Sequence, residues 1–367
     1  MKRITFFINS LSSGGAEHQL VTIANFLSER NYNITITTIS DTQDHYVLDK
    51  KIERVRISKS SNKIVKLLSI WRYFVSIKTD CVIIFCQRNS YFALPALWMR
   101  SRKKVKVICG ERNLTVGSQD KIEKLLFNHL YKRADYIVPN SYSQGRYISE
   151  KAPWLENKLI PITNYTSLDL FCYHEQPQNK TIKIGVFCRY EKQKNCLGFV
   201  NAIRKLREQN ICNFQIYWFG SKHFSNSDLQ NYYDQIENKI QKYKLEGTIF
   251  LNDAVKNVSD IMASCDVICL PSFFEGFSNT ISEAICCGRP VLCSDVSDNS
   301  LMVQNTKNGF LFNPYNIDSI VDAFKSFFRL SQNERIAMGK NSRVIAEKMF
   351  NKEQFVNSYI NLIEEEK

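Results

Sequence analysis

Residues 267–293 read VICLPSFFEGFSNTISEAICCGRPVLC, and this stretch decides the fold. It starts with the apolar run Val267–Leu270 and ends with a second apolar run, Val291–Cys293. A loop with Glu275 and a segment of helical character over about 279–287 lie between them. Strands made almost wholly of apolar residues are typical of parallel sheets, whose neighbouring strands need a crossover helix between them. The stretch therefore predicts a strand–helix–strand unit of an α/β protein.

The same alternation continues on both sides of this stretch. In the second half, the other predicted strands are Ile182–Phe187, Phe214–Phe219 and Thr248–Leu251, with helices near 196–208, 226–243 and 258–263. In the first half, the predicted strands are Ile4–Ile8, Ile34–Ile39, Cys81–Phe85, Val105–Cys109 and Tyr136–Val138, with helices such as Ala16–Ser28 and Lys121–Tyr131. Two such series predict two doubly wound, Rossmann-like α/β domains.

The length of the chain also favours two domains, because 367 residues exceed the size at which a single hydrophobic core stops growing. The polar stretch 174–180, which contains Pro177, interrupts the alternation near the middle of the chain. We therefore expect one domain over residues 1–168 and a second over 169–349. A final helix over about 350–367 could pack back on the first domain.

The net charge of +13 is concentrated in the first half of the chain. Residues 1–170 hold 26 Lys and Arg and 14 Asp and Glu, a balance of +12, whereas the rest hold 23 and 22, a balance of +1. This asymmetry predicts a polyanionic partner for the first half, such as an acidic membrane surface or a phosphorylated lipid. Nucleic acid would also fit the charge, but no recognised nucleic-acid motif is present, so we expect no nucleic-acid partner.

The twelve cysteines do not suggest a disulfide framework or a metal centre. No CxxC pair and no Cys/His ligand spacing occurs, and several cysteines end apolar runs. We therefore interpret the cysteines as buried, reduced thiols of a cytoplasmic protein. Ile4–Ile8 is too short for a signal peptide and no run approaches the roughly 20 apolar residues of a membrane span, so we expect the chain not to cross a membrane.

Ligands of open α/β sheets bind at the carboxyl ends of the strands, so the loops after the strongest strands are the candidate sites. In the first, Gly14 and Gly15 precede a helix and would let an anion approach its N–H groups, although a tight turn explains them equally well. In the second, Arg189 and Lys194 could neutralise a diphosphate, or form a solvated basic loop.

The third loop, after Leu270, gives the strongest signal. Glu275 lies in the loop, and a helix that starts at about Ser278 would offer the N–H groups of Asn279 and Thr280 to a phosphate. Glu283 lies at least one turn inside this helix and could accept hydrogen bonds from vicinal hydroxyls such as those of a ribose. As an alternative, Glu283 could pair with a neighbouring cation.

Glu275 and Glu283, preceded by Pro271-Ser272 and followed by Gly288-Arg289-Pro290-Val291, resemble the Glu-x7-Glu signature of retaining family-4 glycosyltransferases (glycosyl transferases group 1) with the GT-B fold. The segment Gly14–Glu17, the Arg189/Lys194 pair and residues 308–312 match the same family in its order, so the resemblance extends over about residues 3–312. It implies a GT-B fold, in which an acceptor-side domain and a donor domain face an interdomain cleft that holds the donor.

The resemblance also implies roles for the site residues. Arg189 and Lys194 would balance the diphosphate of a nucleotide sugar, and Glu283 would hold its ribose. Glu275 would contact the transferred sugar, together with the backbone at Gly276, Phe277 and Ser278.

The relatives are metal-independent, and the absence of any Asp-x-Asp sequence agrees with this expectation. We expect no metal and no cofactor apart from the donor substrate, with a UDP-sugar favoured. Many relatives carry a histidine in the loop that reads Gly110-Glu111-Arg112-Asn113 here. Glu111 or Arg112 is expected to orient the acceptor or the donor instead.

Residues 61–78 form an amphipathic segment in which Lys63, Lys66 and Arg72 alternate with Trp71 and aliphatic residues. A short basic cluster, Arg102, Lys103 and Lys104, follows. This composition suits an interfacial helix on anionic lipid, and it suits a core-packed helix with a solvated basic face equally well.

Taken with the resemblance, these features predict transfer of a hexose or N-acetylhexosamine to a growing, lipid-linked surface glycan of the capsule, O-antigen or exopolysaccharide type. The acceptor would be a glycan or a polyprenyl-diphosphate-linked sugar, and the protein would lie on the inner face of the cytoplasmic membrane. Two alternatives are a sugar-nucleotide epimerase of the same fold and a non-catalytic protein that binds a sugar nucleotide or polyanion.

Overall fold

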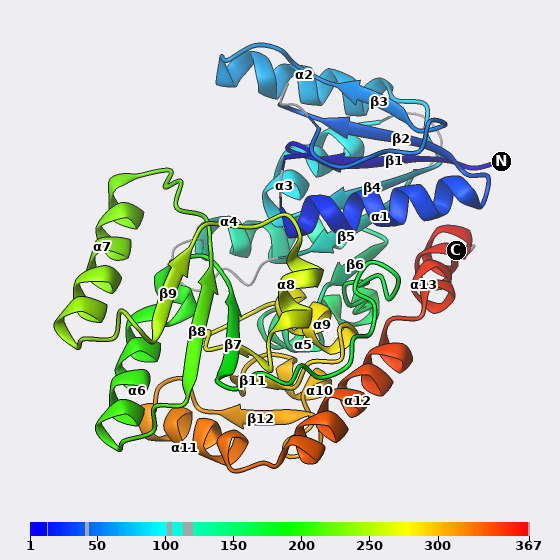
Figure 1. The fold of residues 1–367 in the computed structure, drawn as a ribbon. Coiled ribbons are helices and arrows are strands. Elements are labelled where there is room, and N and C mark those ends of the chain that lie inside the picture. Colours follow the sequence, from blue (N-terminus) through cyan, green and yellow to red (C-terminus); the bar gives the residue numbers. More distant parts are fainter. Residues whose placement is uncertain (13, 41–43, 101–104, 113–119, 366–367) are drawn as a thin grey trace. The chain divides into compact units, whose positions relative to one another are not determined.

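The computed structural model describes residues 1–12, 14–40, 44–100, 105–112 and 120–365. It divides into two compact units, Met1–Tyr165 with Lys352–Lys367 and Thr166–Asn351. Each unit contains a six-stranded parallel sheet flanked by helices, so the predicted pair of doubly wound α/β domains is confirmed (Figure 1). The divisions follow Tyr165 and Asn351, where the sequence analysis placed them after residues 168 and 349.

The first unit has the strand order β3-β2-β1-β4-β5-β6. Its strands are β1 (Arg3–Ile8), β2 (Asn33–Thr38), β3 (Glu53–Arg56), β4 (Cys81–Phe85), β5 (Lys106–Glu111) and β6 (Tyr136–Pro139). Its helices are α1 (Gly15–Glu29), α2 (Lys63–Ser76), α3 (Gln87–Trp98), α4 (Asp120–Leu125), α5 (Tyr142–Lys151) and α13 (Lys352–Glu364), with the short helical turns η1 (Leu126–Leu130), η2 (Tyr131–Arg133) and η3 (Pro153–Lys158).

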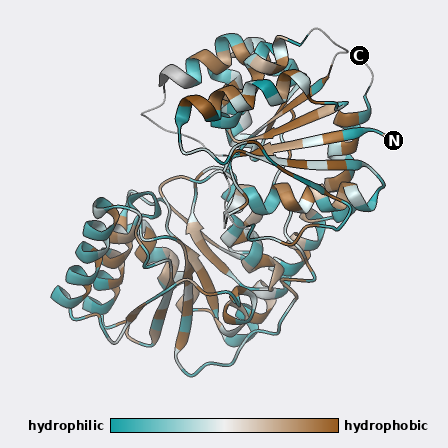
Figure 2. Cartoon of the chain, turned by 90° about the horizontal axis from the view of Figure 1, so that it is seen from above, coloured by the Kyte–Doolittle hydropathy of each residue, from teal (hydrophilic) through white to brown (hydrophobic). Residues whose placement is uncertain are grey.

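Different helices cover the two faces of the first sheet, because successive side chains of a strand point to opposite faces and both faces are apolar. Ile4, Phe6 and Ile8 of β1 pack with α1 and α13 on one face, whereas Phe7 packs with α2, α3 and α5 on the other. Apolar residues accordingly run along several strands of this unit (Figure 2). The final helix α13 therefore completes the core of the first unit.

The second unit repeats this arrangement with the strand order β12-β11-β10-β7-β8-β9. Its strands are β7 (Ile182–Phe187), β8 (Phe214–Phe219), β9 (Ile249–Asn252), β10 (Val267–Leu270), β11 (Val291–Ser294) and β12 (Gly309–Phe312). Its helices are α6 (Cys196–Glu208), α7 (Ser227–Lys242), α8 (Val258–Ser264), α9 (Asn279–Cys286), α10 (Asn299–Met302), α11 (Ile317–Phe328) and α12 (Gln332–Met349), with the helical turn η4 (Lys192–Lys194).

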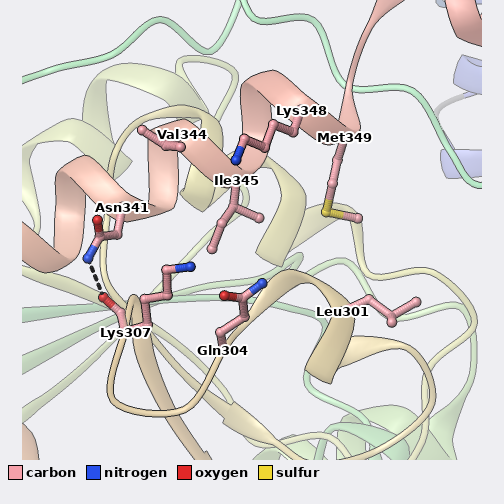
Figure 3. A pocket seen from close by; sticks show the side chains of 8 residues that line it. All are labelled: Leu301, Gln304, Lys307, Asn341, Val344, Ile345, Lys348 and Met349. Atoms are coloured by element: carbon pink, nitrogen blue, oxygen red, sulfur yellow. Dashed lines mark hydrogen bonds between the residues drawn. The ribbon is translucent and has the colours of Figure 1, made fainter.

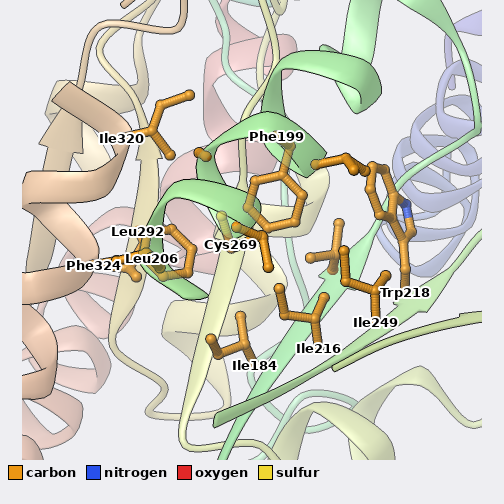
Figure 4. Packing of buried hydrophobic residues seen from close by; sticks show 14 of the residues in the cluster. Ile184, Phe199, Leu206, Ile216, Trp218, Ile249, Cys269, Leu292, Ile320 and Phe324 are labelled. Carbon is orange, nitrogen blue, oxygen red and sulfur yellow. The ribbon is translucent and has the colours of Figure 1, made fainter. Parts of the chain in front are cut away.

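One face of the second sheet is covered by α6, α7 and α11. Trp218 of β8, Phe199 of α6 and Phe324 of α11 are fully buried there, with the ring centroids of Phe199 and Trp218 5.5 Å apart (Figure 4). Burial of each large apolar side chain contributes about 1.5–3 kcal/mol relative to its exposure. This core fixes the strands whose ends carry the candidate site.

The ends of the predicted strands lie within two residues of the observed ones, one predicted helix is divided, and two strands were not predicted. The expected helix Lys121–Tyr131 is divided into α4, the π-helical η1 and the 3-10 turn η2. The short edge strands β3 and β12 have only four residues each, and β3 reads ERVR, without an apolar run. The strands expected at Thr248–Leu251 and Val105–Cys109 are shifted toward the C-terminus by one residue at their starts. No helix of the described residues is long and apolar enough to cross a bilayer.

Candidate functional site

The loops that follow β7 and β10 start side by side in the second sheet. β7 and β10 are neighbours, with Ile184 opposite Val267, although β8 and β9 lie between them in the sequence. Such a reversal of strand order is a topological switch point, where the loops at the carboxyl ends diverge and a ligand can bind. Lys194 follows β7 and Glu275 follows β10, so the fold brings both predicted residues to this point.

Lys194 and Glu275 form an ion pair at the switch point. The Lys194 Nζ lies 2.6 Å from Glu275 Oε1, and the two side chains are only 13% and 9% exposed. Opposite charges with so little access to water stabilise each other, whereas either one alone would carry a large desolvation penalty. The pair therefore holds the two loops together through their side chains.

The backbones of the two loops are also joined, through Gln193. The carbonyl oxygen of Gln193 accepts a hydrogen bond from the N–H of Phe273 at 2.9 Å, and its Nε2 donates to the carbonyl of Phe274 at 2.9 Å. Gln193 precedes Lys194, and Phe274 precedes Glu275. The two loops are thus joined by the side chains of Lys194 and Glu275 and by hydrogen bonds of the residues that precede them.

Helix α9 begins at the same end of the sheet. Ser278 is its N-cap and accepts a hydrogen bond from the N–H of Ile281, so the first two N–H groups of the helix belong to Asn279 and Thr280. The Thr280 hydroxyl donates to the carbonyl of Phe187 at 2.8 Å, which fastens the start of α9 to the end of β7.

Glu283, one turn further into α9, is partly buried, and this burial raises the pKa of its carboxyl to about 8. Among the described residues, its side chain has no hydrogen-bond or ion-pair partner. The alternative of a cation partner for Glu283 therefore finds no support in the described structure. An unpartnered, partly buried carboxyl group keeps its capacity to accept hydrogen bonds from a ligand.

The remaining predicted residues of this unit have separate surroundings. Arg189 shares the loop of Lys194 but is 66% exposed and pairs with Glu191 at 3.0 Å. Gly276 directly follows Glu275, whereas Phe277 is buried and its ring lies edge-on to Phe350 at 6.2 Å. Only the backbone of Phe277 is thus offered at the site.

In the first unit, Gly14 and Gly15 lie at the start of α1, after β1. Gly14 is the extended N-cap residue and Gly15 is the first residue of the helix. The N–H of Gly14 donates to the Tyr46 hydroxyl at 3.0 Å, and the same hydroxyl donates to the Gly14 carbonyl at 2.9 Å. Tyr46 therefore fixes the peptide groups on both sides of Gly14.

Glu111 and Arg112 lie at the end of β5 and are almost fully buried. The Tyr131 hydroxyl donates to Glu111 Oε1, and burial together with the Glu123 carboxyl raises the pKa of Glu111 to about 8, against the opposing effect of Arg112. Arg112 itself donates to Asn164 Oδ1 at 3.2 Å and to the Tyr359 hydroxyl at 2.7 Å. Its guanidinium also lies 4.3 Å from the ring centre of Phe85.

Helix α2 contains the predicted basic residues Lys63, Lys66 and Arg72. Only Ile70 and Phe74 of this helix are buried. Its other large apolar residues are exposed, by 70% at Ile64, 45% at Val65, 48% at Leu67, 53% at Leu68, 43% at Trp71 and 38% at Val75. The exposed face is thus mixed apolar and basic, unlike the solvated basic face of a core-packed helix. Arg102, Lys103 and Lys104 lie outside the described residues.

A pocket of about 160 Å³ between α10 and α12 contains none of the predicted site residues. Figure 3 shows the ammonium groups of Lys307 and Lys348 on either side of Ile345 in this pocket.

The contacts at the switch point include two residues that were not predicted, Gln193 and Ser297, and Tyr46 was missed in the first unit. Gln193 directly precedes Lys194 in the second candidate loop, so its position was a usable signal, whereas nothing in the sequence marks Ser297 or Tyr46.

The chain resembles enzymes that build bacterial glycans. The family model described as glycosyl transferases group 1 matches residues 174–344. The amylovoran biosynthesis glycosyltransferase AmsD of Erwinia amylovora is 24% identical over 301 residues, which cover 80% of this chain and 81% of that protein. The N-acetylgalactosamine-N,N'-diacetylbacillosaminyl-diphospho-undecaprenol 4-alpha-N-acetylgalactosaminyltransferase of Campylobacter jejuni is 25% identical over 315 residues, with coverage of 80% and 81%.

Among solved structures, Anabaena HepE in complex with UDP and glucose has a TM-score of 0.82 and 18% identity, over 98% of this chain and 99% of that chain. At this identity the likeness shows a shared fold.

Proposed function

We propose that the chain is a member of the glycosyl transferases group 1 family, whose model matches residues 174–344, and that it transfers a hexose or N-acetylhexosamine from a nucleoside-diphosphate sugar. The proposed donor is a UDP-sugar. The proposed acceptor is a growing, polyprenyl-diphosphate-linked surface glycan of the capsule, O-antigen or exopolysaccharide type. The names of the Erwinia and Campylobacter relatives, which concern amylovoran and an undecaprenol-linked glycan, support this class of acceptor.

One observation carries the proposal: Lys194, Glu275 and α9 lie together at the switch point of the second sheet, and Glu283 of α9 has no partner among the described residues. Lys194 and Arg189 would bind the diphosphate, together with the first N–H groups of α9 at Asn279 and Thr280. The Glu283 carboxyl would accept hydrogen bonds from the ribose hydroxyls. Glu275 and the backbone at 276–278 would contact the sugar that is transferred.

In the proposed reaction, the acceptor hydroxyl oxygen forms a bond to the anomeric carbon while the bond from this carbon to the diphosphate breaks. The acceptor proton passes to the leaving diphosphate, and attack from the face of departure retains the anomeric configuration. Fixed cations and helix N–H groups stabilise the charge that grows on the diphosphate, because they are oriented before the reaction starts. We propose that this is achieved without a metal ion, consistent with the lack of an Asp-x-Asp motif.

The first unit would contribute Gly14 and Gly15, whose backbone Tyr46 holds in place, and the pair Glu111 and Arg112. We propose that Glu111 and Arg112 orient the acceptor or the donor from the end of β5. Their anchoring by Tyr131, Asn164 and Tyr359 supports a fixed orientation for both side chains.

A donor panel tests the proposal. Purified protein is incubated with UDP-, GDP- and ADP-sugars and a polyprenyl-diphosphate-linked acceptor, and the product and its anomeric configuration are determined by mass spectrometry and NMR. We expect transfer from one UDP-sugar with retention, and unchanged transfer in the presence of EDTA.

In the same assay, Glu283→Ala and Lys194→Ala should each weaken donor binding. Lys348→Ala, which removes an exposed lysine of the same unit outside the site, is the matched control. Unchanged donor affinity in both site variants would contradict the assignment.

We further propose that α2 binds an anionic membrane surface, which would place the enzyme on the inner face of the cytoplasmic membrane. Six exposed apolar side chains on one 14-residue helix forgo the stabilisation that burial would give, and a bilayer interface would restore it. Each Lys or Arg near an anionic surface adds about 1 kcal/mol of attraction.

Liposome flotation measures this binding. The protein should float with vesicles that contain anionic lipid and not with neutral vesicles, and Leu67→Ser/Leu68→Ser/Trp71→Ser should abolish flotation. Leu301→Ser, at an exposed leucine of the second unit, is the control. Equal behaviour on neutral and anionic vesicles would remove the support for a membrane-bound α2.

A further inference from the structure

Ser297 contacts the backbone of Glu275 from a third loop, the one that follows β11. The Ser297 hydroxyl accepts a hydrogen bond from the N–H of Glu275 at 3.3 Å and donates to the carbonyl of Glu275 at 2.5 Å. One hydroxyl group thus binds the peptide groups on both sides of the residue whose carboxylate is paired with Lys194.

The backbone of Ser297 is strained in this position. Its φ is +53°, in the left-handed region that disfavours residues with a Cβ atom. Glycine would adopt this conformation without the steric cost, but glycine carries no hydroxyl to bind Glu275. Backbone strain in folded proteins persists where the surrounding structure over-determines it, and such residues concentrate at functional sites.

The other member of the ion pair is held in a similar way. Asn195, which directly follows Lys194, also has a left-handed backbone, with φ of 52°, and its Nδ2 donates to the carbonyl of Pro314 at 2.9 Å. The loops after β7, β10, β11 and β12 are therefore linked around Lys194 and Glu275. Ser297 itself is partly exposed, so its side chain is not part of the hydrophobic core.

We propose that Ser297 is a positioning residue for the transfer reaction: its hydroxyl keeps the Glu275 carboxylate in place when Lys194 leaves it for the diphosphate of the donor. The inference rests on the proposed function. Without the hydroxyl, Glu275 would lose both hydrogen bonds to its own peptide groups, and in the donor complex the ion pair would no longer compensate for this loss. Turnover would then fall more than donor binding.

Three substitutions separate the hydroxyl from the backbone conformation. Ser297→Gly removes the hydroxyl and relieves the strain, Ser297→Ala removes the hydroxyl and keeps the strain, and Ser297→Thr keeps the hydroxyl. We expect kcat to fall by about 10- to 100-fold in Ser297→Gly and Ser297→Ala, with KM for the donor within about threefold of the wild type. Ser297→Thr should retain kcat per folded molecule, and the thermal stability of Ser297→Gly should match or exceed that of Ser297→Ala.

A double-substitution test shows whether Ser297 acts through Glu275. In a Glu275→Ala background, Ser297→Gly should cause no further loss of kcat, because there is no carboxylate left to position. Thr306→Gly, at another left-handed residue of the same unit that is exposed, is the control and should leave kcat unchanged.

The inference is overturned if Ser297→Gly has the kcat of the wild type. It is also overturned if Ser297→Gly lowers kcat by the same factor in the wild-type and the Glu275→Ala backgrounds. These outcomes are distinct from a failure of the proposed function, in which the wild-type protein itself transfers no sugar.

Discussion

In the part of the chain that the structure describes, each unit contains one carboxyl group whose pKa is raised to about 8, Glu111 in the first and Glu283 in the second, but their surroundings differ. Glu111 receives a hydrogen bond from Tyr131, and its neighbour Arg112 is bound by Asn164 and Tyr359. Glu283 has no such partner among the described residues. Two carboxyl groups thus have the same raised pKa. The hydrogen-bonding capacity of Glu111 is used by its own unit, whereas that of Glu283 remains available to a ligand.

This difference teaches that burial alone does not distinguish a site from a core. Both sheets have the same topology, and both place a carboxyl near the end of a strand or in the helix after it. What differs is whether the hydrogen-bonding capacity of the group is already used. Substitution of Glu283 should therefore change mainly ligand binding, whereas substitution of Glu111 or of the partners of Arg112 should also change the stability of the first unit.

The largest expected effect concerns the ion pair. Lys194→Met should lower turnover by about 10³-fold, because a fixed cation no longer meets the leaving diphosphate. It should also lower the free energy of unfolding by about 3 kcal/mol, since the nearly buried Glu275 carboxylate loses its partner. Lys194→Met/Glu275→Gln should recover stability but not turnover, as measured by chemical denaturation and the transfer assay. Recovery of turnover in the double variant would contradict the role of the Lys194 cation in transfer.

The second effect is on stability and concerns Glu111. Because its pKa is raised in the folded state, its contribution to stability is complete below about pH 4 and is lost as the pH rises through about 8. Glu111→Gln, whose amide oxygen can still accept from Tyr131, should remove this part of the pH dependence. The variant should exceed the wild type by a few kcal/mol at pH 8.5, on the order set by the shift. Parallel stability curves for the two proteins between pH 5 and 8.5 would refute this account of Glu111.

The third effect is on binding and concerns Glu283. Ribose hydroxyls donate to the ionised carboxylate, so donor binding should release a proton from Glu283 at pH values below about 8. The association constant for a UDP-sugar should rise about tenfold per pH unit from pH 6 to pH 8 and then level off. Calorimetry in two buffers of different ionisation enthalpy measures the proton. Glu283→Gln should flatten the profile, and a flat profile in the wild type would show that the ribose is bound elsewhere.

The smallest effect belongs to the first unit again. Tyr359→Phe removes the hydroxyl that accepts from Arg112 at 2.7 Å and should cost about 1–2 kcal/mol of stability. The KM for the donor should not change, because the lost hydrogen bond joins two residues of the first unit and neither belongs to the donor site of the second unit. Tyr32→Phe, which removes a more exposed bond to Glu364 of the same helix, is the control and should cost less. A raised donor KM in Tyr359→Phe would sharpen the role of Arg112 toward the substrate.

The sequence predicts most of the fold because ten of the strands are runs of apolar residues that a helix-covered parallel sheet requires. It also marks Lys194, Glu275 and Glu283 as candidates, because they follow predicted strands and ligands of open α/β sheets bind at the carboxyl ends of the strands. The edge strand β3 was missed for the converse reason: an edge strand is covered on fewer sides, so ERVR shows no apolar run.

The partners of these residues could not be predicted. The pairing of Lys194 with Glu275 and of Arg189 with Glu191 depends on loop conformations that no local pattern encodes. The left-handed backbone of Ser297 gives no signal either, since serine is ordinary in loops. For α2, the amphipathic pattern shows an apolar stripe, but only the structure shows that Ile64 and Leu68 are left uncovered.

Helix α13 follows the second unit in the sequence but belongs to the first unit, and this order affects folding during synthesis. Its buried residues Val356, Tyr359, Leu362 and Ile363 complete a core whose other members precede Tyr165. When α1 and β1 leave the ribosome, one side of their layer therefore stays uncovered until α13 has been synthesised. The second unit, which ends at Asn351, has all its residues before the first unit does. The half that is translated first is the half that can finish folding last.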